Sequence, residues 1–113
     1  MRIRILGCSG GIGAGSRTSA MLVDDDVLID AGTGIGDLGL DDLDGIRHVF
    51  LTHAHLDHIA GLPMLADSIF DPDFEVPLTV YAREETLRAV KDHLFNDAIW
   101  PDFAKLPSPE RPM

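Results

Sequence analysis

Apolar residues follow two different periods along the chain, and each period predicts one kind of element. In the segment 83–95, Leu87, Val90 and Leu94 recur at helical spacing, which predicts an amphipathic helix. Short apolar runs rich in β-branched residues predict strands at 3–6, 18–23, 27–30, 48–52 and 78–81. Because strands come first and then alternate with helices, we predict an α/β fold with a mixed sheet and flanking helices.

The connections are marked by aspartate, glycine and proline. The three aspartates at 24–26 suit a hairpin turn between two strands. The glycine-rich segments 8–16 and 32–36 predict loops, because glycine lets the backbone bend freely. We expect one or two helical turns within 38–43. A longer helix is predicted from about Asp57 to Phe70, where Asp71, Pro72 and Asp73 would end it.

Composition and charge narrow the class of protein. The chain has 113 residues, 19 acidic and 9 basic, for a net charge of −10, which argues against a nucleic-acid-binding surface. A lone cysteine, Cys8, excludes an intrachain disulfide and fits a reducing compartment; we expect it to be a small buried residue. The sequence shows neither the apolar core of a signal peptide nor a run long enough to span a bilayer. We therefore expect a soluble, cytoplasmic protein with no membrane partner.

A cluster of metal-ligand residue types lies between a predicted strand and a predicted helix. His53, His55, Asp57 and His58 place three of the five histidines and an aspartate within six positions. Imidazole nitrogen and carboxylate oxygen are the usual protein ligands for zinc and similar ions. A strand end that delivers such ligands into a turn, with a helix directly behind, is a rigid mount for a metal site.

The spacing within the cluster favours a division between two ions. Alternate side chains of an extended segment share a face, so His53 and His55 can reach one ion, while Asp57 and His58 at the turn can reach a second. Two ions about 4 Å apart can share and activate a bridging hydroxide. This predicts hydrolysis of a phosphoester or a carboxyl derivative. The alternative is that Asp57 caps the helix and the histidines lie in a solvated loop.

The pattern His-x-His-x-Asp-His resembles the signature of the metallo-β-lactamase fold superfamily. The segment Val27–Gly32 is similar to that superfamily's strand ending in Asp-x-Gly. The resemblance implies an αββα sandwich, in which Asp30 would orient a ligand histidine from behind the metal site.

Two further stretches, His55–Leu62 and Leu94–Phe103, are similar to the class II cyclic-nucleotide phosphodiesterases. The resemblance implies hydrolysis of a small 3′,5′-cyclic phosphodiester by a metal-bound hydroxide at a site with two divalent ions, zinc or else manganese or iron. In that reading the metal ligands are the four cluster residues and Asp57 also helps to orient the hydroxide.

The resemblance also implies ligands that this sequence does not show. The superfamily carries a further histidine for each ion and a bridging aspartate downstream of the motif, and no histidine follows residue 103. We therefore expect residues 1–113 to form the N-terminal part of a single metallo-hydrolase domain. An apolar sheet face and a strand edge would then lie unprotected, and the chain would tend to associate into a homo-oligomer.

Two alternative functions stay open from the sequence. One keeps the fold and changes the reaction, to hydrolysis of RNA 3′ ends, sulfate esters or thioesters. The other is non-enzymatic, a truncated product that binds metal weakly and turns nothing over.

Overall fold

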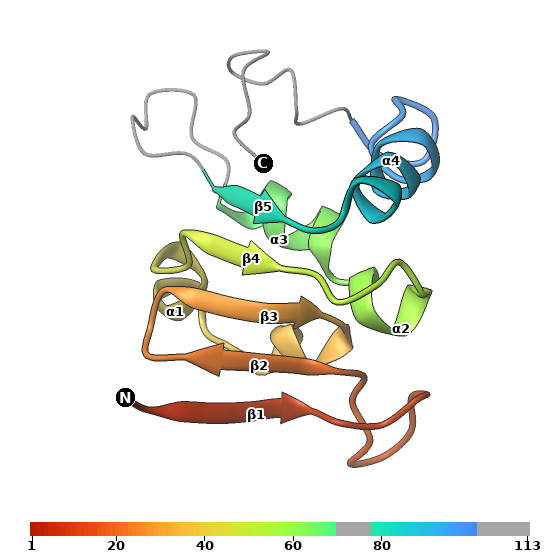
Figure 1. Cartoon of the computed structure of the whole chain (residues 1–113). Helices are drawn as coiled ribbons and strands as arrows, with labels where there is room; N and C mark the ends of the chain where they lie inside the picture. Colours follow the sequence, from red (N-terminus) through yellow and green to blue (C-terminus); the bar gives the residue numbers. More distant parts are fainter. Residues whose placement is uncertain (70–77, 102–113) are drawn as a thin grey trace.

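A computed structural model describes residues 1–69 and 78–101 of the chain. Five strands form one sheet in the order of the sequence (Figure 1). The first three strands pair antiparallel, and the third, fourth and fifth pair parallel. The predicted mixed sheet is thus confirmed. The strands are β1 (Ile3–Gly7), β2 (Ala20–Val23), β3 (Val27–Ala31), β4 (His48–Phe50) and β5 (Thr79–Tyr81).

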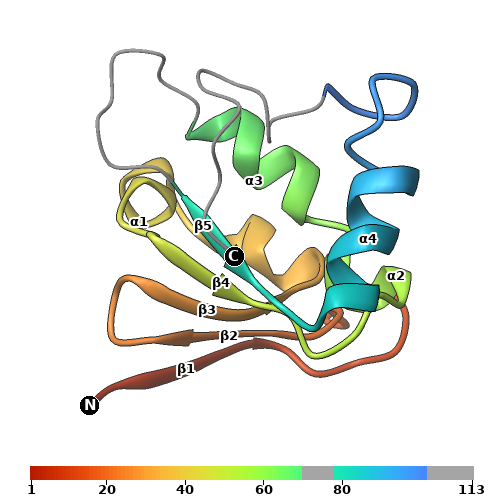
Figure 2. The ribbon, with the colours of Figure 1, turned by 45° about the horizontal axis from the view of Figure 1, so that its top comes forward.

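Short helices follow β3, β4 and β5, and most of them lie on one side of the sheet (Figure 2). The amphipathic helix predicted in 83–95 forms and adds Val90 to the core. No helix in the described part of the chain is both long enough and apolar enough to cross a membrane. The helices are η1 (Thr33–Asp37, a 3₁₀ helix), α1 (Leu40–Asp44), α2 (Leu56–Ile59), α3 (Leu62–Ser68) and α4 (Glu84–His93).

The covered face of the sheet holds the core. Leu22, Leu28 and Val49, one from each central strand, are at most 1% exposed. They pack in one cluster with Ile46 and with Leu62 of α3. Since successive side chains on a strand point to opposite faces, their neighbours in sequence lie on the other side of the sheet.

That other side, which we call the open face, is also apolar. Ile5 lies opposite Met21, Met21 opposite Ile29, and Ile29 opposite Phe50, so one apolar row crosses four strands. Within the described residues this row keeps contact with solvent: Ile5 is 59% and Phe50 43% exposed. On the same face Ile3 is 51% exposed.

The single helix predicted from Asp57 to Phe70 is wrong, because the described part of this segment forms two helices. α2 ends at Ile59 and α3 begins at Leu62. The break lets Gly61 approach the end of β3, where its amide donates to the Ala31 carbonyl at 2.8 Å. A Cβ on Gly61 would lie 2.7 Å from the Gly32 carbonyl oxygen, so close packing requires glycine at the break. Phe70 and the predicted helix end at 71–73 lie outside the described residues.

Two smaller predictions also differ from the structure. The glycine-rich segment 32–36, predicted as a loop, contains η1. Two reciprocal hydrogen bonds join it to the segment just before β2: the Thr18 amide donates to the Thr33 hydroxyl at 2.9 Å, and the Thr33 amide donates to the Thr18 hydroxyl at 2.6 Å. Cys8, expected to be buried, is exposed.

Candidate metal centre

The cluster of histidines lies in the connection that leaves the parallel edge of the sheet. β4 ends at Phe50, and the Leu51 amide still donates to the Tyr81 carbonyl at 2.9 Å. The chain bends at Thr52 and continues to His55, the residue before α2, whose backbone is extended. Asp57 then falls in the first turn of that helix and His58 in the last. The ligand segment is therefore held at both ends: the hydrogen bonds of the sheet fix it before Thr52, and the Gly61–Ala31 hydrogen bond fixes it just after α2.

Three side chains converge on one position. His53, Asp57 and His58 each offer one ligand atom, and these atoms lie within 4.8 Å of one another. The His58 Nε2 to Asp57 Oδ2 distance is 3.5 Å. Two ligands of a tetrahedral zinc ion lie roughly 3.4 Å apart when each bond is about 2.1 Å. The donor set and its spacing are therefore compatible with one divalent ion.

His55 does not join this group of three. Its side chain is exposed, and its ring meets the ring of His53 edge-on with 4.7 Å between centroids. The structure groups His53 with Asp57 and His58, and the predicted sharing of one ion by His53 and His55 stays a prediction. The assignment of all four residues as metal ligands stays a prediction.

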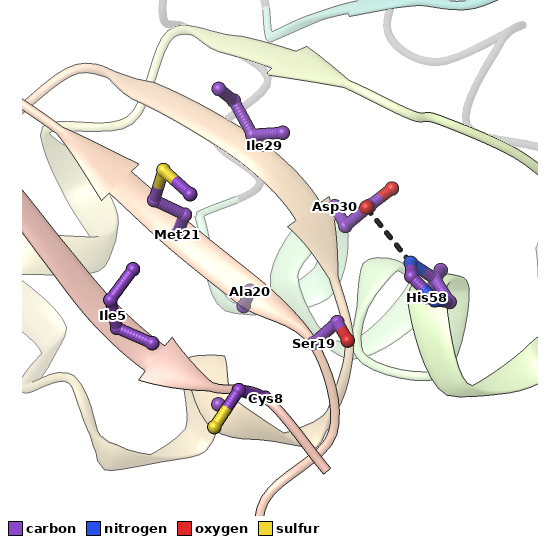
Figure 3. A pocket seen from close by; sticks show the side chains of 9 residues that line it. Ile5, Cys8, Ser19, Ala20, Met21, Ile29, Asp30 and His58 are labelled. Carbon is purple, nitrogen blue, oxygen red and sulfur yellow. Dashed lines mark hydrogen bonds and ion pairs between the residues drawn. The ribbon is translucent and has the colours of Figure 1, made fainter. Parts of the chain in front are cut away.

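Asp30 lies behind the group and is 5% exposed. The pairing of β2 with β3 shifts by one residue here, so Asp30 is an extra residue in its strand, with φ of 59°. Bulges of this kind re-aim side chains beside functional sites, and Asp tolerates the left-handed region better than most residues. The Asp30 carboxylate faces His58, with 2.8 Å between its Oδ2 and the histidine Nδ1 (Figure 3). This is the contact that an orienting role for Asp30 requires.

Thr52 is a site residue that the sequence reasoning missed. Its amide donates to Asp30 Oδ1 at 2.8 Å, and its hydroxyl lies 2.9 Å from Asp30 Oδ2. The same hydroxyl lies 3.0 Å from His53 Nδ1. The sequence places Thr52 directly before the ligands, but its partner Asp30 is 22 residues upstream, so only the fold reveals the contact.

Gly32 is a second residue whose role depends on the fold. A Cβ at this position would lie 2.3 Å from the carbonyl oxygen of Asp57 and 2.3 Å from the Thr18 hydroxyl. No real Cβ tolerates such distances, so a larger residue would push α2 away from β3. The glycine of Asp-x-Gly thus allows the ligand helix to lie against the strand that carries Asp30.

The open face of the sheet leads directly to the site. A cavity of about 270 Å³ has an apolar floor of Ile5, Met21 and Ile29 and ends at Asp30 and His58 (Figure 3). Cys8 and Ser19 also line it. A ligand at the histidines could therefore extend over apolar side chains.

Comparison with known proteins places the chain in a family. The model of the class-II cAMP phosphodiesterases matches residues 42–110, which include the whole histidine cluster. The chain belongs to the class-II cAMP phosphodiesterase family. A 3′,5′-cyclic-nucleotide phosphodiesterase 1 of Saccharomyces cerevisiae is 40% identical to it over 59 residues, 52% of this chain and 16% of that protein. A ribonuclease Z of Natronomonas pharaonis is 33% identical over 109 residues, 91% of this chain and 35% of that protein.

The fold is the metallo-β-lactamase fold: YhfI from Bacillus subtilis, a metallo-beta-lactamase fold protein, has a TM-score of 0.61 at 24% identity and covers 80% of this chain. The structure of unliganded yeast PDE1 has a TM-score of 0.72 at 23% identity and covers 92% of this chain. Zn(2+)-bound PqqB from Methylobacterium extorquens has a TM-score of 0.60 at 25% identity and covers 90% of it. The structural match covers 47% of each of these two solved chains, so this chain spans about half of each. The sequence match covers 16% of the S. cerevisiae relative.

Proposed function

We propose that the chain carries the metal-binding part of a hydrolase that cleaves a 3′,5′-cyclic nucleotide. Its partner in this proposal is the small phosphodiester substrate, with no membrane involved. The observation that carries the proposal is the convergence of His53, Asp57 and His58 on one position, within the segment that matches the class-II family model. Divalent ions held there would supply an activated water and would neutralise charge on phosphorus. Two ions are proposed, with zinc as the first choice and manganese or iron as alternatives.

The residues of this chain divide the remaining tasks. His53, Asp57 and His58 would hold one ion, and His55 is available for a second. A carboxylate oxygen of Asp57 would also accept a hydrogen bond from the attacking water and so orient it. The apolar floor of Ile5, Met21 and Ile29 adjoins His58 and offers a surface for the base of a nucleotide.

Hydrolysis of RNA 3′ ends is the second candidate, because the similarity to ribonuclease Z extends over 91% of the chain. The net charge of −10 weighs against it. A transfer RNA is bound mainly through its phosphates, and this requires a basic surface. The cyclic nucleotide, a small ligand that the ions themselves could neutralise, suits the acidic chain better.

The test uses the purified chain loaded with zinc or with manganese. We expect elemental mass spectrometry to find bound metal and chromatography to detect conversion of cyclic AMP to the 5′-monophosphate. EDTA and His58→Ala should each lower the rate at least about 100-fold, because a ligand is lost. His93→Ala, which replaces an exposed histidine of α4, is the matched control and should leave the rate unchanged.

The outcomes separate the candidates. Turnover of a 3′-extended transfer RNA with none of cyclic AMP would favour the ribonuclease function. Bound metal with no turnover of either substrate would contradict an active enzyme and leave a metal-binding fragment. A chain that binds no metal would overturn the proposal.

A further inference from the structure

The hydroxyl of Thr52 lies between a carboxylate and a histidine. It is 2.9 Å and 3.1 Å from the two oxygens of Asp30 and 3.0 Å from His53 Nδ1. A hydroxyl has one proton to donate, and an ionised carboxylate can only accept. The proton of Thr52 therefore points to Asp30, since two acceptor oxygens would otherwise face each other at hydrogen-bond distance.

This direction fixes the proton on His53. Because the only proton of the Thr52 hydroxyl is given to Asp30, the hydroxyl oxygen can meet His53 Nδ1 only as an acceptor. Nδ1 then carries the hydrogen, and the lone pair of neutral His53 is left on Nε2. The same reasoning applies to His58, whose Nδ1 lies 2.8 Å from Asp30 Oδ2 and must donate to it.

We propose that Thr52 is a positioning residue, which relays the carboxylate of Asp30 to His53 and sets the tautomer in which Nε2 is free to bind a metal ion. One buried carboxylate then orients two ligand histidines, His58 directly and His53 through the hydroxyl. The inference rests on the proposed function only in taking His53 as a metal ligand; the tautomer itself belongs to the metal-free chain.

The position of Thr52 limits the size of its effect. Asp30 is buried, whereas Thr52 is exposed, so water can replace part of what its hydroxyl does. Removing groups that orient metal ligands usually lowers metal affinity by about 10–100-fold. We therefore expect the low end of this range for Thr52, about tenfold.

The first measurement is the tautomer of each histidine, read from ¹⁵N shifts of the two ring nitrogens in the metal-free chain. The experiment is run at about pH 8.5, where imidazole is neutral in model peptides. We expect Nδ1–H for both His53 and His58 in the wild type. Thr52→Val keeps the shape of the side chain but removes the hydroxyl, so His53 should lose this preference while His58 keeps it. Thr52→Ser should restore it.

The second measurement is zinc affinity by competition with a chromophoric chelator. Thr52→Val should bind zinc about tenfold more weakly, and Thr52→Ser should bind it within about twofold of the wild type. Thr79→Val is the matched control, since it makes the same change at a buried threonine of β5 away from the site. It should alter neither the tautomers nor the affinity.

An Nε2–H tautomer of His53 in the wild type would overturn the inference, whether or not any variant folds. An unchanged His53 tautomer in a folded Thr52→Val chain would do the same. Neither result depends on turnover, so a chain that hydrolyses nothing but shows the expected tautomers would contradict the proposed function and leave the role of Thr52 intact.

Discussion

The two faces of the sheet carry similar side chains and differ in what covers them. Leu28 and Ile29 are neighbours on β3 and are isomers of each other, yet Leu28 is fully buried beneath the helices while Ile29 lies on the open face. Sheets in which both faces are apolar occur mainly where both faces are covered. The open face therefore has the composition of an interior surface, and it ends at the metal centre.

The largest expected effect is a difference in stability between two matched substitutions, one on each face of the sheet. Leu28→Ala should destabilise the chain by about 2–5 kcal/mol, because it opens a cavity in close-packed surroundings. Ile29→Ala removes a side chain of the same size from the half-buried open face and should cost at most about 1 kcal/mol. Urea denaturation followed by circular dichroism measures both, at a protein concentration too low for the chain to associate. Equal losses would mean that the open face is covered in solution.

A second comparison tests what the open face does when it is unprotected. We expect the chain to associate with copies of itself through this face, and Ile5→Lys to weaken the association about tenfold, or ~1.4 kcal/mol. Met64→Lys is the control, because Met64 of α3 is equally exposed, 59% in each case, but lies on a helix that packs on the covered side. Sedimentation velocity over a concentration series gives both constants. Equal weakening by the two substitutions would place the contact elsewhere.

A third comparison changes polarity alone, and its substitution on the open face, Val27→Thr, has the smallest effect expected. Val27→Thr puts a hydroxyl of the same shape on the open face, where water can reach it, and should change the free energy of unfolding by no more than about 0.5 kcal/mol. Val49→Thr makes the same change on the covered face, where the hydroxyl has no room for water, and should cost about 1–3 kcal/mol. A reversed order in thermal melts would contradict the assignment of the two faces.

Local patterns predicted much of the fold and missed what depends on contact between distant segments. The alternation of apolar residues and the three aspartates at 24–26 gave the β2–β3 hairpin, because each depends on near neighbours. The helix predicted from Asp57 failed at Gly61, whose close approach to Gly32 cannot be read from either segment alone. The 3₁₀ helix η1 was missed because glycine permits that conformation without favouring it.

The site divides in the same way. The ligand cluster could be found because its members lie within six positions of one another. Thr52 could not be assigned a role, because the orientation of its hydroxyl depends on a hydrogen bond to Asp30. Asp30 lies on the neighbouring strand β3, at a bulge where its backbone is left-handed. The predicted sharing of one ion by His53 and His55 stays a prediction. β4 ends at Phe50, before either histidine, so the strand itself does not set which way these two side chains point.

The hairpin that carries Asp30 also has a consequence for the order of folding. β2 and β3 are joined by three residues, and hairpins of this kind close in about 1–10 μs. The pairing of β3 with β4 must close a longer loop, from Ala31 to His48, and pairings at such sequence separation form more slowly. We therefore expect the Asp30 carboxylate to reach its native position during folding before His53 and His58 pack against it.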